Sequence, residues 1–548
     1  MRKLLIAASA ALLLVATACG SDATRSPSAV ESNTLAPVDA GGSTPGSNSP
    51  AGTTPAPGAT SPRSTPSNGT TSPTIDLPAG SIDWKPLTTH EETIPTDVVL
   101  DSTEQGTLDV PIDYTDPSAG DFTLYMVRHP AGKPAERIGT VLVNPGGPGV
   151  SGTGFAEYAQ FNFGADLLDH FDIVAWDPRG VGKTTPAIDC IDSSQYDHFY
   201  DSADITPDTP AEKQQIVDLA KEFTDDCVRK NAKIIDHVGT NDSARDIDSI
   251  RKALGEQKIS YFGFSYGSEL GATWATLFPS TVRAAVLDGA VDPNAGLVQG
   301  GLDQSKGFET SLDTFLAQCS SNKKCAFRNG GHADTAFDAL MQSIDAAPLA
   351  AEAGRPKLTR GAALSAVSQA MYDSSDWPTL ATALAQAQQG DGTGLMELYD
   401  QYLRRQPDGT YDNSLEAFPV ILCMSSATRT TVAEEDAEAP KITAIAPRLS
   451  PGTTGGYQCS FFPPSPDPRI TITGQGAGPI LVVGTTGDPA TPLAGTRNMA
   501  KALEQGVLLV VDGEHHTGYR VNACSITTVD NYLIDPVNDL PKDGAECK

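Results

Sequence analysis

The sequence predicts an α/β fold in which a mostly parallel sheet is covered by helices on both faces. Six short apolar runs support this, and each ends in a loop rich in Gly, Asp or His: "IGTVLVNPGGPG", "FDIVAWDPRGVG", "ISYFGFSYG", "VRAAVLDGAVDP", "GPILVVGTTGDPATP" and "GVLLVVDGEHHTG". Continuous apolar runs are typical of strands that are buried on both faces. Helical stretches such as "SARDIDSIRKALG" separate them, as crossovers between parallel strands require. Ligands of such sheets bind at the carboxyl ends of the strands, where these polar loops lie.

The strands are expected to come from two stretches of the chain with a helical segment between them. Folded character begins near Ile82, where "GTLDVPIDY" and "DFTLYMVRH" flank the turn "TDPSAG". From residue 295 to 470 the apolar residues recur with a helical period, and no strong β run interrupts them. Because the strand pattern then resumes, we expect a core of residues 81–294 and 471–548 with a helical insertion over 295–470.

The first residues have the pattern of an export signal. Arg2 and Lys3 precede an apolar run that is short for a membrane span, and small residues then lead to Cys19. This position resembles the cleavage site of bacterial lipoproteins, where the cysteine carries the lipid. An ordinary signal peptide with an incidental cysteine is the alternative. We expect residues 1–18 to be a signal peptide and Cys19 to anchor the exported protein on the outer face of a bacterial cell membrane.

The segment after Cys19 is expected to be a tether. Residues 19–80 are dominated by Ser, Thr, Pro, Gly and Ala, as in "GGSTPGSNSPAGTTPAPGATSPRSTPSNGTTSPT". Such a composition cannot bury enough apolar surface to offset the entropy of ordering, so the segment is predicted to be disordered and extended.

Several classes of function are excluded. The formal net charge of the 548-residue chain is −30, which repels nucleic acid. The run "RGVGKTTP" is not a P-loop, because Asp177 stands where the first glycine is needed and Pro186 interrupts the following helix. There is no CxxC or HExxH spacing for a metal. We expect no cofactor, no metal and no nucleic-acid partner, and the sequence leaves the oligomeric state open.

The cysteine count fits an oxidising compartment. Nine cysteines less Cys19 leave eight, an even number that is typical of disulfides in exported proteins. Eight cysteines allow 105 connectivities, so pairing of sequence neighbours is a guess: Cys190 with Cys227, Cys319 with Cys325, Cys423 with Cys459, and Cys524 with Cys547.

One serine lies where a strand-like run meets a helix-like run. Ser265 stands between Gly263 and Gly267 in "ISYFGFSYGSELGATWA", the context that a nucleophile elbow requires. The small glycines allow a tight turn that presents the hydroxyl above the sheet. A tight connection without chemistry is the alternative, since five residues alone are a weak signal.

A serine nucleophile needs a base and an acid that orients the base. The histidines after Ser265 are His332, in the helical segment, and His515 and His516, just past the last long apolar run. Either histidine of this pair suits a base at a strand end, and a pair of surface histidines is the alternative. Asp488 follows the preceding strand and suits the acid, although Asp-Pro also opens ordinary turns.

An oxyanion hole needs two backbone N–H groups beside the serine. One is expected from Tyr266, directly after Ser265, and the other from the glycine-rich loop between Asn144 and Gly149. Glycine lets such a loop approach the substrate closely. A phosphate-binding loop is the alternative, but the spacing does not fit GxGxxG.

These motifs together resemble the secreted tripeptidyl aminopeptidases, which are α/β-hydrolases related to proline iminopeptidases. The resemblance spans about Trp84 to Cys547 and rests on "VNPGGPG", "WDPRGVGKT", "GFSYGSELGATWATLFP", "VLDGAVDP", "GTTGDPATP" and "HTGY". It implies the α/β-hydrolase fold with a helical cap, Ser265 as nucleophile, Asp488 as acid, His516 as base, and Gly147 and Tyr266 as oxyanion donors. His516 rather than His515 matches the family pattern, although Glu514 and His515 intrude after the glycine.

An aminopeptidase must also hold the N-terminal ammonium of its substrate, usually with carboxylates. Glu269, where the family commonly has a neutral residue, is one candidate, and Asp288 and Asp292 are two others. Each is equally suited to be a capping or turn residue.

The resulting expectation is an exported serine peptidase of tripeptidyl or prolyl type, tethered to the membrane, that releases short peptides from N-termini through an acyl-enzyme. A carboxylesterase or lipase with the same triad is the alternative, since a triad does not choose between ester and amide. A non-catalytic binding lipoprotein with the same fold is the second alternative.

Overall fold

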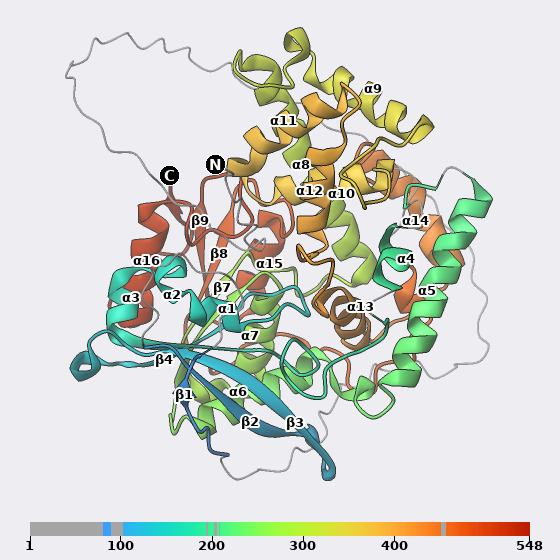
Figure 1. Ribbon diagram of the computed structural model, residues 1–548. Coiled ribbons are helices and arrows are strands. Elements are labelled where there is room, and N and C mark those ends of the chain that lie inside the picture. The colour runs from blue at the N-terminus through green and yellow to red at the C-terminus, as the bar shows by residue number, and fades with distance from the viewer. Residues whose placement is uncertain (1–79, 89–101, 193–194, 202–204, 208, 451–455) are drawn as a thin grey trace, which may run out of the picture. The chain divides into compact units, whose positions relative to one another are not determined.

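The computed structural model describes residues 80–88, 102–192, 195–201, 205–207, 209–450 and 456–548 (Figure 1). The predicted signal peptide, Cys19 and the tether up to Ala79 lie outside these residues, so they stay predictions. In the described part of the chain, no helix is both long and apolar enough to cross a membrane.

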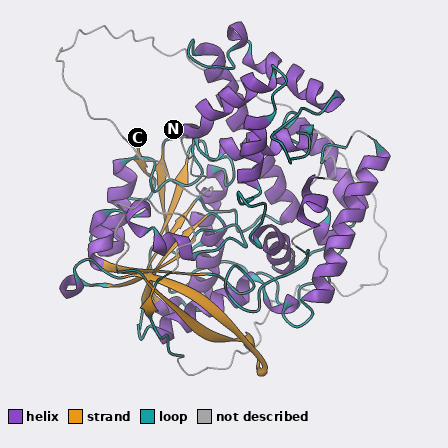
Figure 2. Ribbon diagram, viewed as in Figure 1, coloured by secondary structure: helices purple, strands orange, loops and turns teal. Residues whose placement is uncertain are grey.

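The described strands form one ten-stranded sheet in the order β1-β2-β3-β5-β4-β6-β7-β8-β9-β10. Figure 2 shows the strands in orange, with helices around them. Their bounds are β1 (Lys85–Pro86), β2 (Glu104–Asp113), β3 (Asp116–His129), β4 (Gly139–Asn144), β5 (Phe171–Trp176), β6 (Ile259–Phe264), β7 (Val282–Asp288), β8 (Ile480–Thr485), β9 (Gly506–Val511) and β10 (Ala545–Cys547). The strands from β5 to β10 in this order are parallel, whereas β1, β2 and β3 add an antiparallel edge. The predicted mostly parallel sheet is confirmed.

Helices cover both faces of the sheet, as predicted. One apolar core contains Ile247 of α6, Leu270 of α7 and Met499 of α15, and the core on the other face contains Leu167 of α3 and Leu533 of α16. The helices outside the long segment between β7 and β8 are α1 (Thr153–Glu157), α2 (Ala159–Asn162), α3 (Ala165–His170), α4 (Tyr196–Asp201), α5 (Pro210–Lys230), α6 (Thr240–Ala253), α7 (Tyr266–Leu277), α15 (Leu493–Ala502) and α16 (Ala523–Ile534).

The segment between β7 and β8 is helical in the described residues (Figure 1). It contains α8 (Leu297–Ser321), α9 (Ala333–Ala346), α10 (Arg360–Met371), the short 3₁₀ turn η6 (Ser374–Asp376), α11 (Trp377–Ala387), α12 (Thr393–Tyr402), α13 (Ser414–Met424) and α14 (Val432–Ile445). Helices α8 to α12 share an apolar core of their own, to which Phe315, Leu364 and Trp377 belong. Their amphipathic pattern is therefore explained by packing on one another.

Helix α13 differs from the other helices of this segment. Its residues Val420 and Ile421 belong to the core of the sheet rather than to the separate helical core. Asn413, at its start, donates to the carbonyl oxygens of Gly180 (2.9 Å) and Ile188 (3.0 Å). Helix α13 is thus part of the body that carries the sheet.

Four disulfides are present in the structure. They join Cys190 to Cys227, Cys319 to Cys325, Cys423 to Cys459, and Cys524 to Cys547. Each disulfide joins two cysteines that are neighbours in the sequence, in the pairing expected above. Cys423–Cys459 ties α13 to the chain that leads back to the sheet, and Cys524–Cys547 ties α16 to β10.

Candidate active site

Ser265 lies on a sharp turn between β6 and α7. Its backbone angles are φ 55° and ψ −125°, a conformation that non-glycine residues rarely adopt and that is common at functional sites. A Cβ atom on Gly263 would lie 2.1 Å from the carbonyl oxygen of Gly267, and one on Gly267 would lie 2.6 Å from that of Asn144. Both glycines of the motif are therefore required by backbone contacts, and the sharp turn between strand and helix has the geometry that the predicted nucleophile elbow needs.

Asp488 and His516 form a direct pair in the loops after β8 and β9. The Nδ1 atom of His516 lies 2.9 and 3.1 Å from the two carboxylate oxygens of Asp488. Asp488 also accepts backbone N–H groups from Ala490 (3.0 Å), Thr491 (2.8 Å) and Thr517 (3.0 Å). Burial raises the pKa of Asp488, but His516 and these N–H groups outweigh burial and leave that pKa below its usual value. Asp488 is thus an anion that fixes the orientation of the imidazole.

The end of β7 brings this pair next to the serine. The N–H of Ser265 donates to the carbonyl oxygen of Asp288 at 2.8 Å. A Cβ atom on the next residue, Gly289, would lie 3.4 Å from Cε1 of His516. The serine backbone and the imidazole therefore both adjoin residues 288–289.

The loop after β4 approaches Ser265 closely. A Cβ atom on Gly146 would lie 2.5 Å from the carbonyl oxygen of Phe264, 2.9 Å from Cβ of Ser265 and 3.0 Å from the nitrogen of Tyr266. The N–H of Gly146 donates to the side chain of Asn144 at 3.0 Å. Its φ of 101° and the φ of 105° at Gly147 belong to the region that favours glycine. The loop from which Gly147 is predicted to donate therefore lies directly beside Ser265, and the side chain of Asn144, at the start of this loop, supports it.

Helix α13 contacts the other end of this loop. A Cβ atom on Gly149 would lie 2.7 Å from the nitrogen of Phe418 and 2.9 Å from Cβ of Ala417. Phe418 itself is 45% exposed. A helix from the segment between β7 and β8 thus forms one wall beside the loop.

The three carboxylates predicted to hold a substrate ammonium are placed differently. Asp288 is fully buried and accepts the N–H groups of Gly518 (2.7 Å) and Tyr519 (2.8 Å). Burial raises its pKa to about 6 against the opposing effect of these bonds. The prediction for Asp288 is wrong, because it has no surface to offer a ligand; it fixes the loop that carries His516.

Glu269 is not a free carboxylate either. It is 8% exposed, and its Oε1 atom lies 3.0 Å from Nη1 of Arg469. Asp292 is partly exposed, accepts from the side chain of Asn498 at 2.7 Å, and accepts the N–H of Asn294 at 2.9 Å. Asp292 thus has the turn role that the sequence offered as its alternative. Glu269 forms an ion pair with Arg469.

His515 and His516, the two histidines that the sequence offers as the base, have separate partners. The Nε2 atom of His515 lies 3.1 Å from Asp373 at η6, within the helical segment, whereas His516 faces Asp488. His332, the third candidate, precedes α9 within the helical segment.

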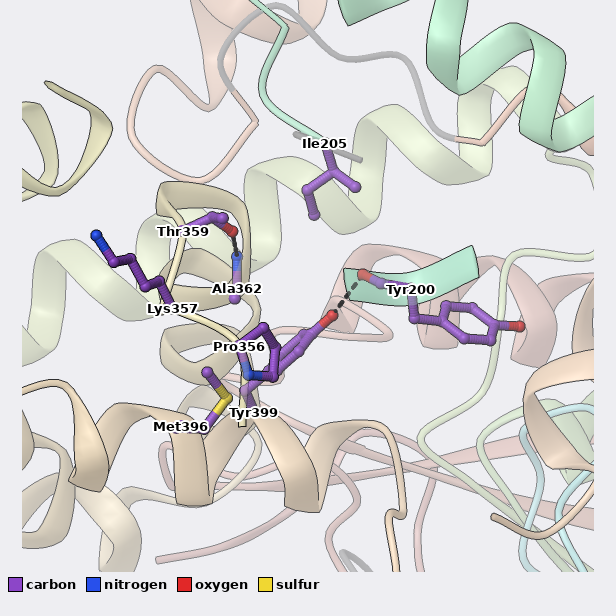
Figure 3. Close-up of a pocket in the computed structure, with 8 residues that line it drawn as sticks. All are labelled: Tyr200, Ile205, Pro356, Lys357, Thr359, Ala362, Met396 and Tyr399. Carbon is purple, nitrogen blue, oxygen red and sulfur yellow. Dashed lines mark hydrogen bonds between the residues drawn. The ribbon is translucent and has the colours of Figure 1, made fainter. Parts of the chain in front are cut away.

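Two other features of the molecule do not form part of this site. A cavity of about 10 Å³ between α4, α10 and α12, to which Tyr200 and Tyr399 contribute, has room for about one water molecule (Figure 3).

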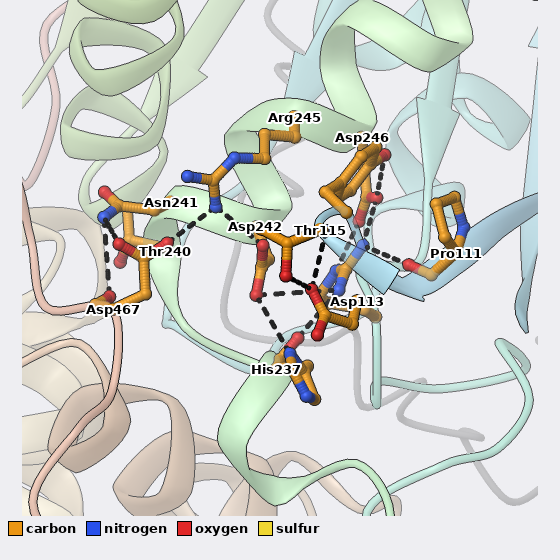
Figure 4. A network of polar contacts seen from close by, with 12 residues as sticks. Pro111, Asp113, Thr115, His237, Thr240, Asn241, Asp242, Arg245, Asp246 and Asp467 are labelled. Atoms are coloured by element: carbon orange, nitrogen blue, oxygen red, sulfur yellow. Dashed lines mark hydrogen bonds and ion pairs between the residues drawn. The ribbon is translucent and has the colours of Figure 1, made fainter. Parts of the chain in front are cut away.

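A buried polar network joins β2, the loop after β5 and α6: Arg179 pairs with Asp246, and Arg245 with Asp242 and Asp467 (Figure 4). The network fixes Arg179, the first residue of the run "RGVGKTTP". Within the described ranges, no group of three His, Cys, Asp or Glu side chains could hold a metal ion.

Comparison with known proteins agrees with this geometry. The family described as "alpha/beta hydrolase fold" matches residues 139–519. Serine protease Hip1 of Mycobacterium tuberculosis (strain H37Rv) is 34% identical over 465 residues, which cover 81% of this chain and 86% of that protein. Carboxylesterase B of the same strain is 32% identical over 80% of this chain and 85% of that protein. Tripeptidyl aminopeptidase of Streptomyces coelicolor is 29% identical over 78% and 80%.

The family match covers more than half of the chain. With relatives at 32–34% identity over 80–81% of its length, the chain belongs to the α/β-hydrolase family and is a serine hydrolase.

Proposed function

We propose that the protein is a serine peptidase that removes short peptides from the N-termini of its substrates through an acyl-enzyme on Ser265. The observation that carries the proposal is the Asp488–His516 pair, 2.9 Å long, after the carboxyl ends of β8 and β9, at the same edge of the parallel sheet as the Ser265 turn after β6. The serine protease and aminopeptidase names of two relatives support peptides as the substrate class.

The proposed mechanism follows the usual roles of a serine triad. His516 accepts the proton of the Ser265 hydroxyl while the oxygen attacks the scissile carbonyl carbon. The imidazolium that forms is stabilised by the Asp488 anion, which accepts from its Nδ1–H. His516 then gives the proton to the leaving amine, and the acyl-enzyme remains. Water, deprotonated by the same imidazole, releases the peptide acid and restores Ser265.

The negative charge on the carbonyl oxygen needs two N–H donors. Tyr266 is the first residue of α7, so its N–H stands at a helix start, where the helix dipole also favours negative charge. Gly147 supplies the second donor from the loop that contacts Ser265 through Gly146. Asn144 supports that loop because its side chain accepts the N–H of Gly146.

The helical segment is proposed to act as a cap that limits the length of substrate. It reaches the site at two places. Phe418 of α13 adjoins the oxyanion loop, and the carbonyl oxygen of Tyr372, at the end of α10, accepts the N–H of His516 (2.8 Å). Export by residues 1–18 and anchoring through Cys19 on the outer face of the membrane complete the proposal, and both rest on the sequence pattern.

An esterase is the second candidate, and the name of the carboxylesterase relative favours it. The same triad cleaves esters, whose leaving groups are easier to expel. The two candidates differ in whether amide bonds are turned over.

A substrate panel tests the proposal. The purified chain without residues 1–18 is assayed with p-nitroanilides of one, two and three residues and with short acyl p-nitrophenyl esters. We expect peptide anilides to be cleaved, with activity lost in Ser265→Ala and retained in Ser321→Ala, a control at the exposed end of α8. Cleavage of esters alone would favour the esterase. A folded wild-type protein that turns over neither class, and that no fluorophosphonate labels, would refute both.

A further inference from the structure

A strand-like contact joins the helical segment to the loop that carries His516. The N–H of His516 donates to the carbonyl oxygen of Tyr372 (2.8 Å), and the N–H of Ser374 donates to that of Glu514 (3.1 Å). Asp373 and His515 face each other across this antiparallel bridge. The ring of Tyr372 also meets the imidazole of His516 edge-on, with 5.5 Å between ring centres. The backbone on both sides of His515, including the N–H of the proposed base His516, is therefore held by residues about 140 positions earlier in the chain.

Both ring nitrogens of His515 face hydrogen-bond acceptors. Its Nδ1 atom lies 2.6 Å from the carbonyl oxygen of His516 and 3.2 Å from that of Thr517, and its Nε2 atom lies 3.1 Å from Oδ2 of Asp373. A neutral imidazole has only one N–H and cannot donate on both sides. Both ring nitrogens can donate to these acceptors at once only when the ring is doubly protonated and cationic.

The surrounding charges favour this cation. Burial opposes it, but Asp373 and the two carbonyl groups outweigh burial and raise the pKa of His515. The pKa of Asp373 is lowered, because its bond to His515 outweighs burial. The nearby groups that also titrate, Asp376 on η6 and Glu514 on the same loop, bear negative charge when ionised and so favour the cation further.

The carbonyl groups that His515 binds flank a strained residue. Thr517 has φ 70°, and for a β-branched residue this left-handed conformation is a genuine outlier. Its N–H donates to Asp488 at 3.0 Å, while its carbonyl oxygen faces His515. The turn that orients His516 is thus held from inside by the acid of the triad and from outside by the His515 cation.

We propose that Asp373 and His515 are positioning residues. Asp373, from the helical segment, forms with His515 an ion pair that holds the strained turn at Thr517, and with it the imidazole of His516. The inference rests on the proposed role of His516 as base. If so, the segment from α8 to α12 has two roles. It covers the substrate, and through Asp373 it holds the loop that carries the proposed base. Access of substrate must then come from another side, since lifting η6 would release the base.

The test uses Asp373→Asn, His515→Gln and the double variant, assayed on whichever substrate class the wild type cleaves. Rates are normalised to sites counted by fluorophosphonate titration, so that unfolded protein is not counted. We expect kcat to fall about 10- to 100-fold with KM nearly unchanged, the loss that a misplacement of about 1 Å causes. The double variant is expected to lose no more than the worse single variant, because the two residues act as one pair. Asp373→Glu, which keeps the charge, is expected to restore part of the rate.

The pH profile distinguishes positioning from general packing. The ratio of the wild-type kcat to that of Asp373→Asn is expected to be largest at pH values below the raised pKa of His515. Above that pKa the ratio is expected to shrink, because the neutral ring of the wild type also loses one of its two hydrogen bonds. Asp338→Asn breaks an exposed ion pair to Arg448 in the same helical segment and serves as the matched control, with no change expected.

Single variants with wild-type kcat, additive losses, or a pH-independent ratio would overturn the inference. These results would leave the proposed function intact if Ser265→Ala is inactive. Activity in Ser265→Ala would instead overturn the proposed function itself.

Discussion

Gly146→Ala is the substitution for which the structure predicts a loss of activity most directly. The added Cβ would lie 2.5 Å from the carbonyl oxygen of Phe264, whereas an ordinary Cβ contact begins at 3.4 Å. The atom that it meets belongs to the backbone at the end of β6, so it cannot rotate away. The loop after β4 must therefore retreat by about 0.9 Å, and it takes the neighbouring N–H of Gly147 with it.

Two magnitudes follow from this displacement. Removal of one oxyanion donor lowers kcat by about 10²–10³, and a shift of around 1 Å in a positioned group causes losses of about 10². We therefore expect kcat to fall by about 10²–10³. The φ of 101° at Gly146 adds a conformational strain of roughly 1–3 kcal/mol for alanine, which lowers the free energy of unfolding.

The assay is steady-state hydrolysis with sites counted by active-site titration, and circular dichroism to verify the fold. Gly154→Ala is the matched control, since a Cβ atom there meets nothing within 4 Å. It is expected to keep the wild-type kcat. A folded Gly146→Ala enzyme with a kcat close to that of the wild type would refute the assignment of this loop to the oxyanion hole.

Three further outcomes are expected. Asp488→Asn should lower kcat by about 10⁴ in steady-state assays, because an amide favours the wrong tautomer of the imidazole; a loss below tenfold in folded protein would argue against its role. Asp373→Asn should reduce the free energy of unfolding most between about pH 4 and 6.5. Two contributions are both present in that window. The raised pKa of His515 stabilises the fold at low pH, and this stabilisation is lost as the pH rises through that pKa. The lowered pKa of Asp373 stabilises the fold at higher pH, and this stabilisation is lost as the pH falls through that pKa. Urea titrations at several pH values would show an unchanging difference if this linkage were absent. Replacing both Cys190 and Cys227 by serine should lower that free energy by about 3–4 kcal/mol for a loop of 37 residues, and an unchanged denaturation midpoint would contradict the bridge.

The fold and the outline of the site could be predicted because the signals are local. Strand β6, the turn at Ser265 and helix α7 follow one another within 19 residues, so the apolar run, the two glycines and the helical run indicate the elbow together. Asp488 and His516 could be found for a similar reason. Parallel strands place their carboxyl ends at one edge, and both residues come shortly after such ends.

The contacts that decide the roles of carboxylates are remote in sequence, and here the prediction was incomplete. Asp288 looked available because it ends a strand, but its two N–H partners come from a loop 230 positions later. The neutralising partner of Glu269 is Arg469, 200 positions away. Residue type and local pattern do not reveal such pairs. Asp373 likewise stood in a helical segment with no motif, and only the fold brings it to His515.

The helical period predicted the elements between β7 and β8 but not their partners. An amphipathic pattern shows that a helix has an apolar face, and it does not say which surface covers that face. Helices α8 to α12 cover one another, whereas Val420 and Ile421 of α13 pack into the core of the sheet. The difference has a functional consequence, because α13 adjoins the loop at Gly149.

The central claim is that Ser265 is the nucleophile, and mapping a covalent label tests it most directly. The wild-type protein is treated with a biotinylated fluorophosphonate, digested, and analysed by mass spectrometry. We expect one labelled peptide, with the phosphonyl group on Ser265, and loss of this label in His516→Ala, which removes the base. A label on another residue, or no label on a folded protein that hydrolyses its substrate, would contradict it.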